Sequence, residues 1–488
     1  MNVSALTVLP VGVFLGAAYA APLVHRWYRR GLSVVVLGAG FAGLGMAVLL
    51  AYRVATTGPL HYFLGGWVPP WGIEVIVDRW AALGLLAVTG VGLPVLVYAL
   101  YDAEHELDAH VVGRYFGLML VLMAAMLGVI MAADVFNLFV FVEISSLAAC
   151  GIIAVKGDRT ATEASLRYLI LGALGSGALL LGVALLFMVT GHLNLRLAGD
   201  QIMTAVLEYP KVVYAGLGFA ILGMSIKAAL FPLHVWLPDA HASAPTPSSA
   251  MLSGLVVKVY IFGLWRLFDV MFGEGLMTAV SVRGLLLVLA SLGIFGGSIL
   301  AIGQDDLKRM LAYSTVANIG YVFLGLGLNS ERALIGAALH IINHALMKAA
   351  LFLAAGAIIH ATGTRHVRRL AGIGLRMPWT MGSFTIGALA MVGIPPLNGF
   401  VSKWYLALGA LDAGQPLYVI VILVSSLLSG LYYAPIIISA FFEPPRHGSE
   451  ARDPHLFMTG PTVLLAAGCV LLGLFPSLLL VLLGRWAG

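Results

Sequence analysis

Residues 212–232 read VVYAGLGFAILGMSIKAALFP, an apolar stretch that holds one charge, Lys227, and ends at Pro232. About 20 apolar residues are what an α-helix needs to cross the hydrocarbon core of a bilayer. A charge in the middle of such a helix costs roughly 2.5–3.5 kcal/mol on insertion scales, so charges there are rare and mark function. Proline ends or kinks a helix, which a membrane tolerates only beside protein or water. The stretch therefore predicts a broken membrane helix with a lysine beside a hydrated path.

The rest of the chain has the same apolar character. Of 488 residues, 61% are hydrophobic and 10% are charged, which excludes a soluble globular domain of this length. The expected fold is an all-α polytopic membrane protein of about 14 transmembrane helices, starting near residues 4, 31, 80, 115, 134, 164, 212, 246, 280, 310, 333, 378, 416 and 456. Residues 56–79 are too polar to span and suit a loop or a short hairpin, and residues 191–210 suit a short interfacial helix.

The charges of the loops predict the orientation. Lys and Arg concentrate in the cytoplasmic loops of membrane proteins. With the N-terminus outside, the inside loops hold fifteen Lys and Arg residues, among them Lys308 and Arg446, and the outside loops hold eight, among them Arg266 and Arg485. We therefore expect a multi-pass protein of the cell inner (cytoplasmic) membrane with both termini outside.

A second stretch, residues 393–403 (GIPPLNGFVSK), repeats the combination of a Pro/Gly break and a lysine, Lys403. Interrupted helices at corresponding positions of two halves are typical of transporters built from inverted repeats. We expect two inverted five-helix repeats with discontinuous helices 7 and 12. The expected division is N-terminal helices 1–3 with an outside loop in 1–114, the first repeat in 115–270, the second repeat in 271–445 and a C-terminal helix 14 in 446–488.

Other ionisable residues also fall inside apolar spans. Glu143 lies nine residues after Asp134 and should be buried, either in a structural ion pair or as a functional carboxylate that tunes a lysine. A lone histidine on an apolar face is usually a packing residue. His340, His344 and Lys348, however, lie at i, i+4 and i+8, form one titratable stripe and favour a relay. His234, in residues 231–241 (FPLHVWLPDAH), is a weaker candidate. The candidate site residues are Glu143, Lys227, Lys258, His340, His344, Lys348, Lys403 and His234.

Residues 34–43, VVVLGAGFAG, match the strand and G-x-G-x-x-G pattern of dinucleotide-binding folds. That fold also needs an acidic residue about 20 positions onward, and none occurs between Phe41 and Trp71. Small residues spaced along an apolar stretch instead favour close packing of membrane helices. Cys150 and Cys469 lie too far apart in sequence to indicate a metal or iron–sulfur site. We expect no cofactor and no metal ion.

Five segments resemble one family: residues 136–143 (FNLFVFVE), 231–241, 306–315 (DLKRMLAYST), 344–348 (HALMK) and 393–403. They resemble the antiporter-like subunits shared by Mrp-type cation/proton antiporters, membrane-bound hydrogenases and respiratory complex I. They are most similar to the D-type subunit of Mrp antiporters and to its counterpart in hydrogenase complexes. The resemblance covers most of the chain and implies a fourteen-helix core with inverted repeats and a central polar axis. It implies that Glu143 and Lys227 form the input pair, that Lys403 forms the distal end, and that the bridge between them is made by Lys258, His340, His344 and Lys348.

The function that follows is a proton-translocating subunit of a multisubunit Mrp-type Na+/proton antiporter, with a buried Glu/Lys/His axis. The alternative is a proton-pumping membrane subunit of a complex I-like oxidoreductase, whose redox centres would reside in sister subunits. Genes for iron–sulfur or nickel-binding subunits beside this one would favour the alternative. A purely structural scaffold would not retain the buried lysines. The expected partners are other membrane subunits, protons, Na+ as a further candidate ion and the lipid bilayer, with no nucleic acid.

Overall fold

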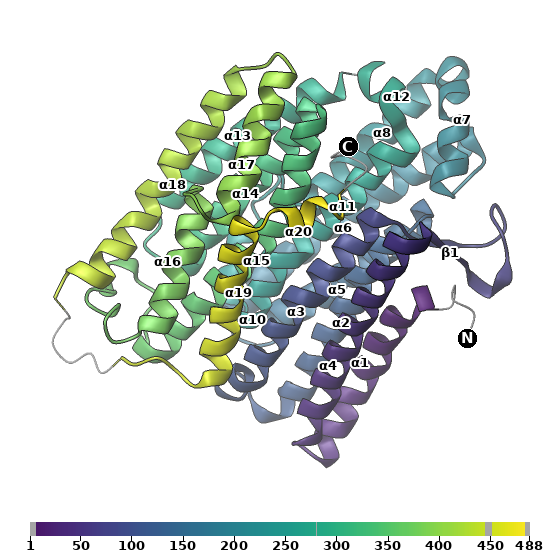
Figure 1. The fold of residues 1–488 in the computed structure, drawn as a ribbon. Helices are drawn as coiled ribbons and strands as arrows, with labels where there is room; N and C mark the ends of the chain where they lie inside the picture. The colour runs from purple at the N-terminus through teal and green to yellow at the C-terminus, as the bar shows by residue number, and fades with distance from the viewer. Residues whose placement is uncertain (1–5, 280, 445–450, 484–488) are drawn as a thin grey trace. The chain divides into compact units, whose positions relative to one another are not determined.

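The computed structural model describes residues 6–279, 281–444 and 451–483 (Figure 1). Both chain ends lie outside the described residues, as do Arg446 and Arg485. The described chain is helical apart from a two-stranded sheet. Ten of its helices are long and apolar enough to cross a membrane, judged by length and composition. The other expected spans correspond to α1 (Leu9–Trp27) and to short or interrupted helices, so fourteen spans remain a prediction.

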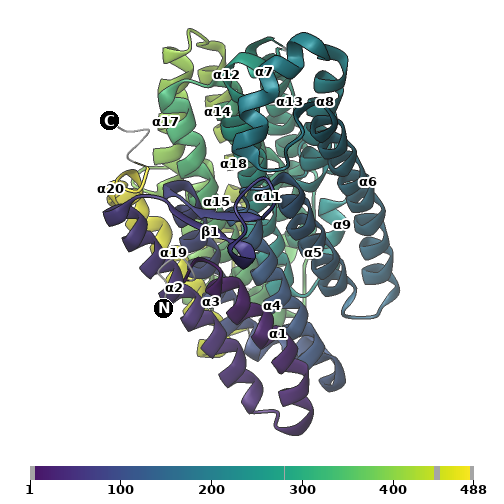
Figure 2. The same ribbon diagram turned by 90° about the vertical axis from the view of Figure 1, so that its right-hand side faces the viewer.

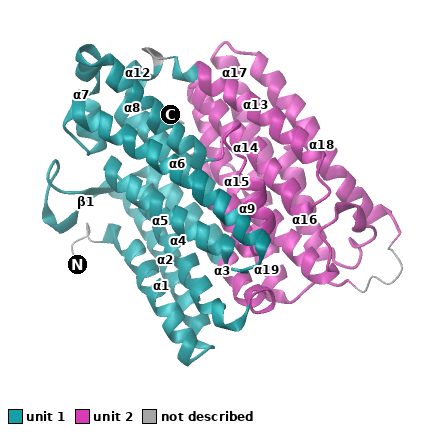
Figure 3. Ribbon diagram, turned by 180° about the vertical axis from the view of Figure 1, so that it is seen from behind, with its two compact units in different colours: residues 1–93, 108–228, 256–283 teal, residues 94–107, 229–255, 284–488 magenta. Residues whose placement is uncertain are grey.

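The chain divides into two compact units (Figure 3). Unit 1 comprises Met1–Leu93, Asp108–Ala228 and Val256–Arg283. Its helices are α1, α2 (Gly31–Thr57), the first part of α3 (Arg79–Glu106), α4 (Ala109–Met131), α5 (Val135–Ala154), α6 (Arg159–Thr190), α7 (Leu195–Glu208), α8 (Pro210–Lys227), α11 (Val257–Arg266), η4 (Leu267–Phe272) and α12 (Gly273–Ala279). In two perpendicular views α1, α2 and α4 lie side by side (Figures 1 and 2).

Two sequence predictions for this unit, a hairpin after α2 and a glycine pattern inside a membrane helix, are confirmed. The polar segment after α2 forms a hairpin of β1 (Leu60–Phe63) and β2 (Glu74–Val77), antiparallel and joined through η2 (Leu64–Gly66). The G-x-G-x-x-G pattern lies inside α2, where a Cβ on Gly43 would overlap the Phe14 ring of α1. The glycine therefore permits close helix packing, as predicted, and does not form a nucleotide-binding turn.

Unit 2 comprises Pro94–Leu107, Ala229–Leu255 and Gly284–Gly488. Apart from the end of α3, its elements are α9 (Leu237–Ser243), α10 (Thr246–Met251), most of η3 (Leu252–Val256) and of α13 (Val282–Ile302), α14 (Leu307–Leu328), α15 (Glu331–Thr362), η5 (Val367–Arg369), α16 (Pro378–Val392), α17 (Asn398–Asp412), α18 (Leu417–Phe442), α19 (Leu456–Leu474) and α20 (Ser477–Leu480). It contains the α15 stripe and the second predicted break.

Each unit contains a helix that begins in the same way. An aspartate caps both helices: Asp134 accepts a hydrogen bond from an amide of α5, and Asp306 accepts one from an amide of α14. Val135 N then donates to Leu193 O at 2.8 Å, and Leu307 N donates to Arg365 O at 2.9 Å. The start of α5 is thus bonded to the segment that follows α6, and the start of α14 to the segment that follows α15.

The helices that precede those segments also match. α6 and α15 each have 32 residues, and each ends at a glycine in the left-handed region, Gly191 at φ 72° and Gly363 at φ 66°. Glycine is favoured there because a Cβ would be strained. Asp158 caps α6 and Ser330 caps α15. The amide of Ala161 and the hydroxyl of Thr160 hold the pKa of Asp158 below its usual value. The two units therefore share a local architecture.

Both predicted helix breaks are present. α8 ends at Lys227, residues 228–236 form turns, and α9 begins at Leu237. α16 ends at Val392, and α17 begins at Asn398 after a turn that opens with Gly393. Proline lies in each break and cannot donate a backbone hydrogen bond, which explains why neither helix continues.

Candidate functional site

The first predicted pair, Glu143 and Lys227, is brought together within unit 1. Lys227 Nζ at the end of α8 lies 3.6 Å from Glu143 Oε2 on α5. The same nitrogen donates a hydrogen bond of 2.7 Å to Ser146 Oγ, one helical turn after Glu143. Ser176 Oγ of α6 donates to Glu143 Oε2. Three helices thus supply one ion pair and the hydroxyls that bind it.

The two partners differ in exposure. The Lys227 side chain is 2% exposed, whereas that of Glu143 is 33% exposed. A buried carboxylate was predicted for Glu143, but α5 packs against α4 and α6 over only part of its circumference. The exposure of Glu143 differs from the prediction because it depends on which helices pack beside α5. The hydrophobicity of the α5 sequence alone does not indicate this packing.

Gly172 of α6 leaves space beside this pair. A Cβ at Gly172 would lie 3.1 Å from Ser146 Oγ and 3.5 Å from Lys227 Nζ. Sequence reasoning did not single out Gly172, Ser146 or Ser176. The available signal for one of them was the polar Ser145–Ser146 pair that follows Glu143 in an apolar helix.

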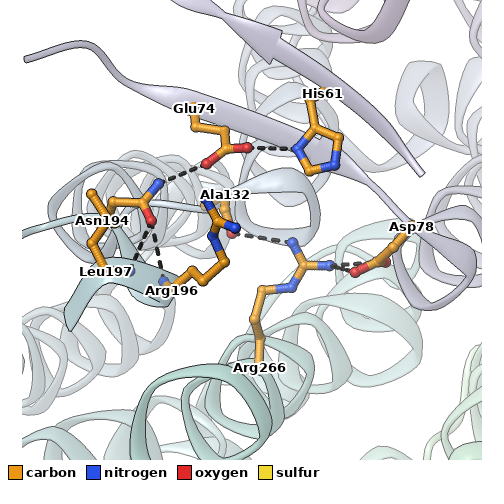
Figure 4. A network of polar contacts seen from close by, with 8 residues as sticks. All are labelled: His61, Glu74, Asp78, Ala132, Asn194, Arg196, Leu197 and Arg266. Carbon is orange, nitrogen blue, oxygen red and sulfur yellow. Dashed lines mark hydrogen bonds and ion pairs between the residues drawn. The ribbon is translucent and has the colours of Figure 1, made fainter. Parts of the chain in front are cut away.

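Lys258 lies on α11 and is 4% exposed. The end of its helix is anchored by Arg266, whose Nη2 contacts the two Asp78 carboxylate oxygens at 3.0 and 2.8 Å (Figure 4). Arg266 Nη1 donates to Ala132 O at 3.2 Å, just before the start of α5. Arg266 is only 3% exposed and is the last residue of α11, so it lies in a helix and not in a loop as expected. This arginine links the helix of Lys258 to the segment that leads into the helix of Glu143.

The hairpin adds a second set of contacts near the start of α5 (Figure 4). Glu74 Oε2 accepts a hydrogen bond of 2.7 Å from Asn194 Nδ2, and Glu74 Oε1 lies 2.6 Å from His61 Nδ1. Asn194 Oδ1 accepts from the amides of Arg196 and Leu197 and so caps α7. The carboxylate of the hairpin therefore fixes the segment to which α5 is bonded.

We expect Asp78→Ala to lower the free energy of unfolding by about 3–5 kcal/mol, because it leaves a buried guanidinium without its carboxylate. The measurement is the unfolding temperature of the purified protein in detergent. Glu163→Ala is the matched control: it breaks the exposed Arg159–Glu163 pair, with side chains 91% and 54% exposed, and should cost no more than about 0.5 kcal/mol. Equal unfolding temperatures for the two variants would contradict the anchoring role of Arg266.

Unit 2 brings the α15 stripe together with Lys403. The His340 and His344 rings are stacked with centroids 5.6 Å apart, and His340 Nδ1 lies 2.9 Å from Ser402 Oγ. The Tyr321 ring lies 5.3 Å from the His340 ring, and Lys403 Nζ lies 4.8 Å from the centroid of Tyr321. A lysine over an aromatic face is attracted by the ring quadrupole. Tyr321 and Ser402 therefore join His340 to Lys403.

Lys403 Nζ binds the end of α16. It donates to Met391 O at 2.9 Å, to Val392 O at 3.0 Å and to Ser426 Oγ at 3.1 Å. The two carbonyls are the last of the helix before the break and have no partner within the helix. The lysine of the second break thus caps the broken helix.

The opposite end of α16 is held by Asp453, which precedes α19. Its carboxylate accepts hydrogen bonds from Trp379 N at 3.1 Å and from Thr380 N at 3.0 Å. Thr380 Oγ1 adds a third, at 2.6 Å. These amides belong to the first turn of the helix, where backbone donors lack intrahelical partners. α16 is therefore capped at both ends by side chains from other elements.

Lys348 of α15 is fully buried. Its Nζ donates to Leu311 O at 2.8 Å and to Ser314 Oγ at 2.5 Å, both on α14. Ser314 Oγ lies 3.1 Å from the Tyr433 hydroxyl of α18. The stripe of α15 is thus connected to two further helices.

The shared architecture of the two units puts different residues at matching positions. Glu143 and Thr315 each lie nine residues after the aspartate that caps their helix. Ser176 and Lys348 each lie eighteen residues after the residue that caps α6 or α15. Unit 1 thus has Glu143 and Ser176 at these two positions, and unit 2 has Thr315 and Lys348.

His234 and Lys308 are two further buried polar residues of unit 2. His234 is 6% exposed in the turn before α9, where its ring packs 4.9 Å from the Phe231 ring and 6.3 Å from the Tyr313 ring. These aromatic contacts place it beside α14 and not on the α15 stripe. Lys308 is 1% exposed, and its Nζ donates to Ala244 O at 3.0 Å. It therefore caps the end of α9, and it lies in the first turn of α14 and not in a loop as expected.

Comparisons with known proteins identify the family of the chain. A family model described as "NADH:quinone oxidoreductase/Mrp antiporter, TM" matches residues 132–429. The chain is 41% identical to NADH-quinone oxidoreductase subunit N of Desulforudis audaxviator, over 96% of both chains. It is 32% identical to the D-type subunit of a Na(+)/H(+) antiporter of Alkalihalophilus pseudofirmus, over 96% of this chain and 93% of that one.

A solved structure gives the same result for the fold. A chain of the Mrp complex from Dietzia sp. DQ12-45-1b superposes with a TM-score of 0.90 at 28% identity, over 100% of this chain and 97% of that one. These relatives are named as subunits or come from a multisubunit complex. The resemblance of the sequence motifs to the antiporter-like subunit family is confirmed. The chain is a multi-pass membrane protein that belongs to the NADH:quinone oxidoreductase/Mrp antiporter family of transmembrane subunits.

Proposed function

We propose that the chain translocates protons along a path of buried ionisable side chains. The observation that carries the proposal is the Glu143–Lys227 pair, 3.6 Å apart at a helix break. An ion pair of this kind inside apolar helices is costly, and ion pathways are where such residues occur. A nearby carboxylate stabilises the charged form of a lysine, so a change in the pair alters the tendency of Lys227 to hold a proton. The proposed path residues are Glu143, Lys227, Lys258, His340, His344, Lys348 and Lys403, with His234 at its border.

We further propose that two inverted five-helix repeats, residues 115–270 and 271–445, lie between three N-terminal helices in 1–114 and a fourteenth helix in 446–488. The matching caps of α5 and α14, the equal lengths of α6 and α15, and the two helix breaks support a duplicated architecture. In this arrangement the carboxylate belongs to the first repeat and the histidine stripe to the second.

The proposed assembly is a multisubunit Mrp-type Na+/proton antiporter. The TM-score of 0.90 to a chain of an Mrp complex supports this choice. A second candidate is the proton-pumping membrane arm of a complex I-like oxidoreductase, favoured by the 41% identity to an NADH-quinone oxidoreductase subunit. Both candidates use the same path in this chain and differ in the partner subunits. We propose the cytoplasmic membrane as the location, with both termini outside.

We expect the chain expressed alone in an antiporter-deficient host to insert in the membrane without producing a Na+-dependent pH change in vesicles. Coexpression with the subunits encoded beside it should restore one, because a proton path needs partners that couple it to a second ion or to a redox reaction. The measurement is the fluorescence of a pH-sensitive dye in membrane vesicles after addition of Na+.

The same preparation separates the two candidates. A pH change driven by added Na+ supports the antiporter. A pH change that requires an electron donor and acceptor instead supports the redox-driven complex. Robust Na+/proton exchange by the purified single chain in liposomes would overturn the proposal that it works only as a subunit.

A further inference from the structure

We propose that Ser146, Ser314 and Ser426 are positioning residues of the proton path, each a reversible hydrogen-bond partner of one lysine. Ser146 Oγ lies 2.7 Å from Lys227 Nζ, Ser314 Oγ lies 2.5 Å from Lys348 Nζ, and Ser426 Oγ lies 3.1 Å from Lys403 Nζ. The inference rests on the proposed proton path and assigns a role to residues outside its titratable groups.

The chemistry of the two groups explains the pairing. A lysine ammonium has three N–H donors and no acceptor, whereas the neutral amine has two donors and one lone pair. A serine hydroxyl can both accept and donate. It therefore accepts from the ammonium and, after rotation about its Cβ–Oγ bond, donates to the amine. Because a buried polar group without a partner is costly, a hydroxyl that serves both protonation states keeps the free-energy difference between them small.

The carbonyls that bind two of these lysines cannot reverse in this way. Lys403 Nζ also donates to the carbonyls of Met391 and Val392, and Lys348 Nζ to the carbonyl of Leu311. A carbonyl only accepts, so it suits the N–H groups that both protonation states keep. The two remaining donors of neutral Lys403 match its two carbonyls, which leaves the lone pair for Ser426.

Ser314 shows how the reversal is balanced. Its hydroxyl lies 2.9 Å from Leu311 O, to which it can donate while it accepts from the ammonium. When it turns its hydrogen to neutral Lys348, Leu311 O still accepts from Lys348 Nζ at 2.8 Å. Leu311 O therefore keeps a donor throughout the exchange.

The proton step involves no electron transfer. The N–H bond of the ammonium breaks, and the proton forms a new bond with a path water molecule or with the next basic side chain. The serine keeps its own proton and only rotates. The ionisable groups that face Lys227 include Glu143 from α5 and, through Ser146, Tyr168 from α6. Tyr432 and Tyr433 from α18 face Lys348 through Ser314, and Tyr321 from α14 faces Lys403.

The test compares Ser146→Ala, Ser314→Ala and Ser426→Ala with the corresponding threonine variants in the coexpressed complex. We expect each alanine variant to lower the proton translocation rate about tenfold, the factor that loss of one hydrogen bond produces. The pH dependence of the rate should also change, because the two lysine states are no longer equally well bonded. Threonine retains the hydroxyl and should restore most of the rate.

Ser298→Ala is the matched control. Ser298 is fully buried, and its hydroxyl donates within its own helix, α13, to Ile294 O at 2.7 Å, so its loss should leave the rate and the pH profile unchanged. Alanine variants with normal rates and pH profiles, in a complex that Lys227→Ala inactivates, would overturn the serine proposal and leave the proton path standing. A reduced rate with an unchanged pH profile and no recovery by threonine would also overturn it. Normal transport by Lys227→Ala would instead refute the proton path itself.

Discussion

Glu143→Gln is expected to reduce proton translocation by the assembled complex by more than about tenfold, while Glu143→Asp retains part of it. Glutamine keeps the shape of the side chain and can still accept from Ser176, but it removes the negative charge 3.6 Å from Lys227 Nζ. Two unit charges about 4 Å apart interact by about 4 kcal/mol at an effective dielectric constant of about 20. Aspartate keeps the charge at a greater distance from the lysine.

The measurement is the initial rate of proton movement in vesicles, normalised to the amount of assembled complex. Glu163→Gln is the control, because Glu163 is a half-exposed carboxylate on α6 that pairs with Arg159. It should transport at the normal rate. Full activity of Glu143→Gln in assembled complexes would mean that the carboxylate is structural and that the input pair is wrongly assigned.

Lys227→Ala and Lys403→Ala are each expected to abolish translocation without preventing assembly. Each substitution removes a side chain that takes up and releases a proton in the proposed path. The arginine variants should fail as well, because a guanidinium stays charged at any accessible pH and cannot release one. Lys403→Ala also removes the cap from Met391 O and Val392 O, so a lower unfolding temperature should accompany its loss of transport.

Lys211→Ala provides the comparison on the same helix. Lys211 lies exposed in the first turn of α8, at the opposite end from Lys227. The Lys211→Ala substitution should leave both assembly and transport unchanged. Near-normal transport by Lys227→Arg would exclude proton release by this residue.

The sequence predicted the features that local chemistry determines. Proline and glycine next to Lys227 and Lys403 marked both helix breaks, because these residues act on the backbone where they stand. The spacing of His340, His344 and Lys348 placed them on one face of a helix, since that depends only on helical periodicity.

Contacts between distant segments could not be predicted in the same way. Lys308 and Arg266 lie within one turn of a helix end and look like loop residues, but α9 and Asp78 bury their charges. Ser176 and Ser426 lie 33 and 23 residues from the groups they bind, and nothing near them in sequence indicates those partners. The exposure of Glu143 likewise depends on which helices pack beside α5.

The two caps of α16 have an electrical consequence. A helix carries a partial positive charge at its N-terminus and a partial negative charge at its C-terminus. Asp453 supplies a carboxylate at the first end and Lys403 an ammonium at the second, so the macrodipole of this short helix is compensated at both ends. When Lys403 gives up its proton, the compensation at the break is lost while that at Asp453 remains. In the proposed proton path, each release of a proton from Lys403 would therefore leave the last turn of α16 without its compensating charge.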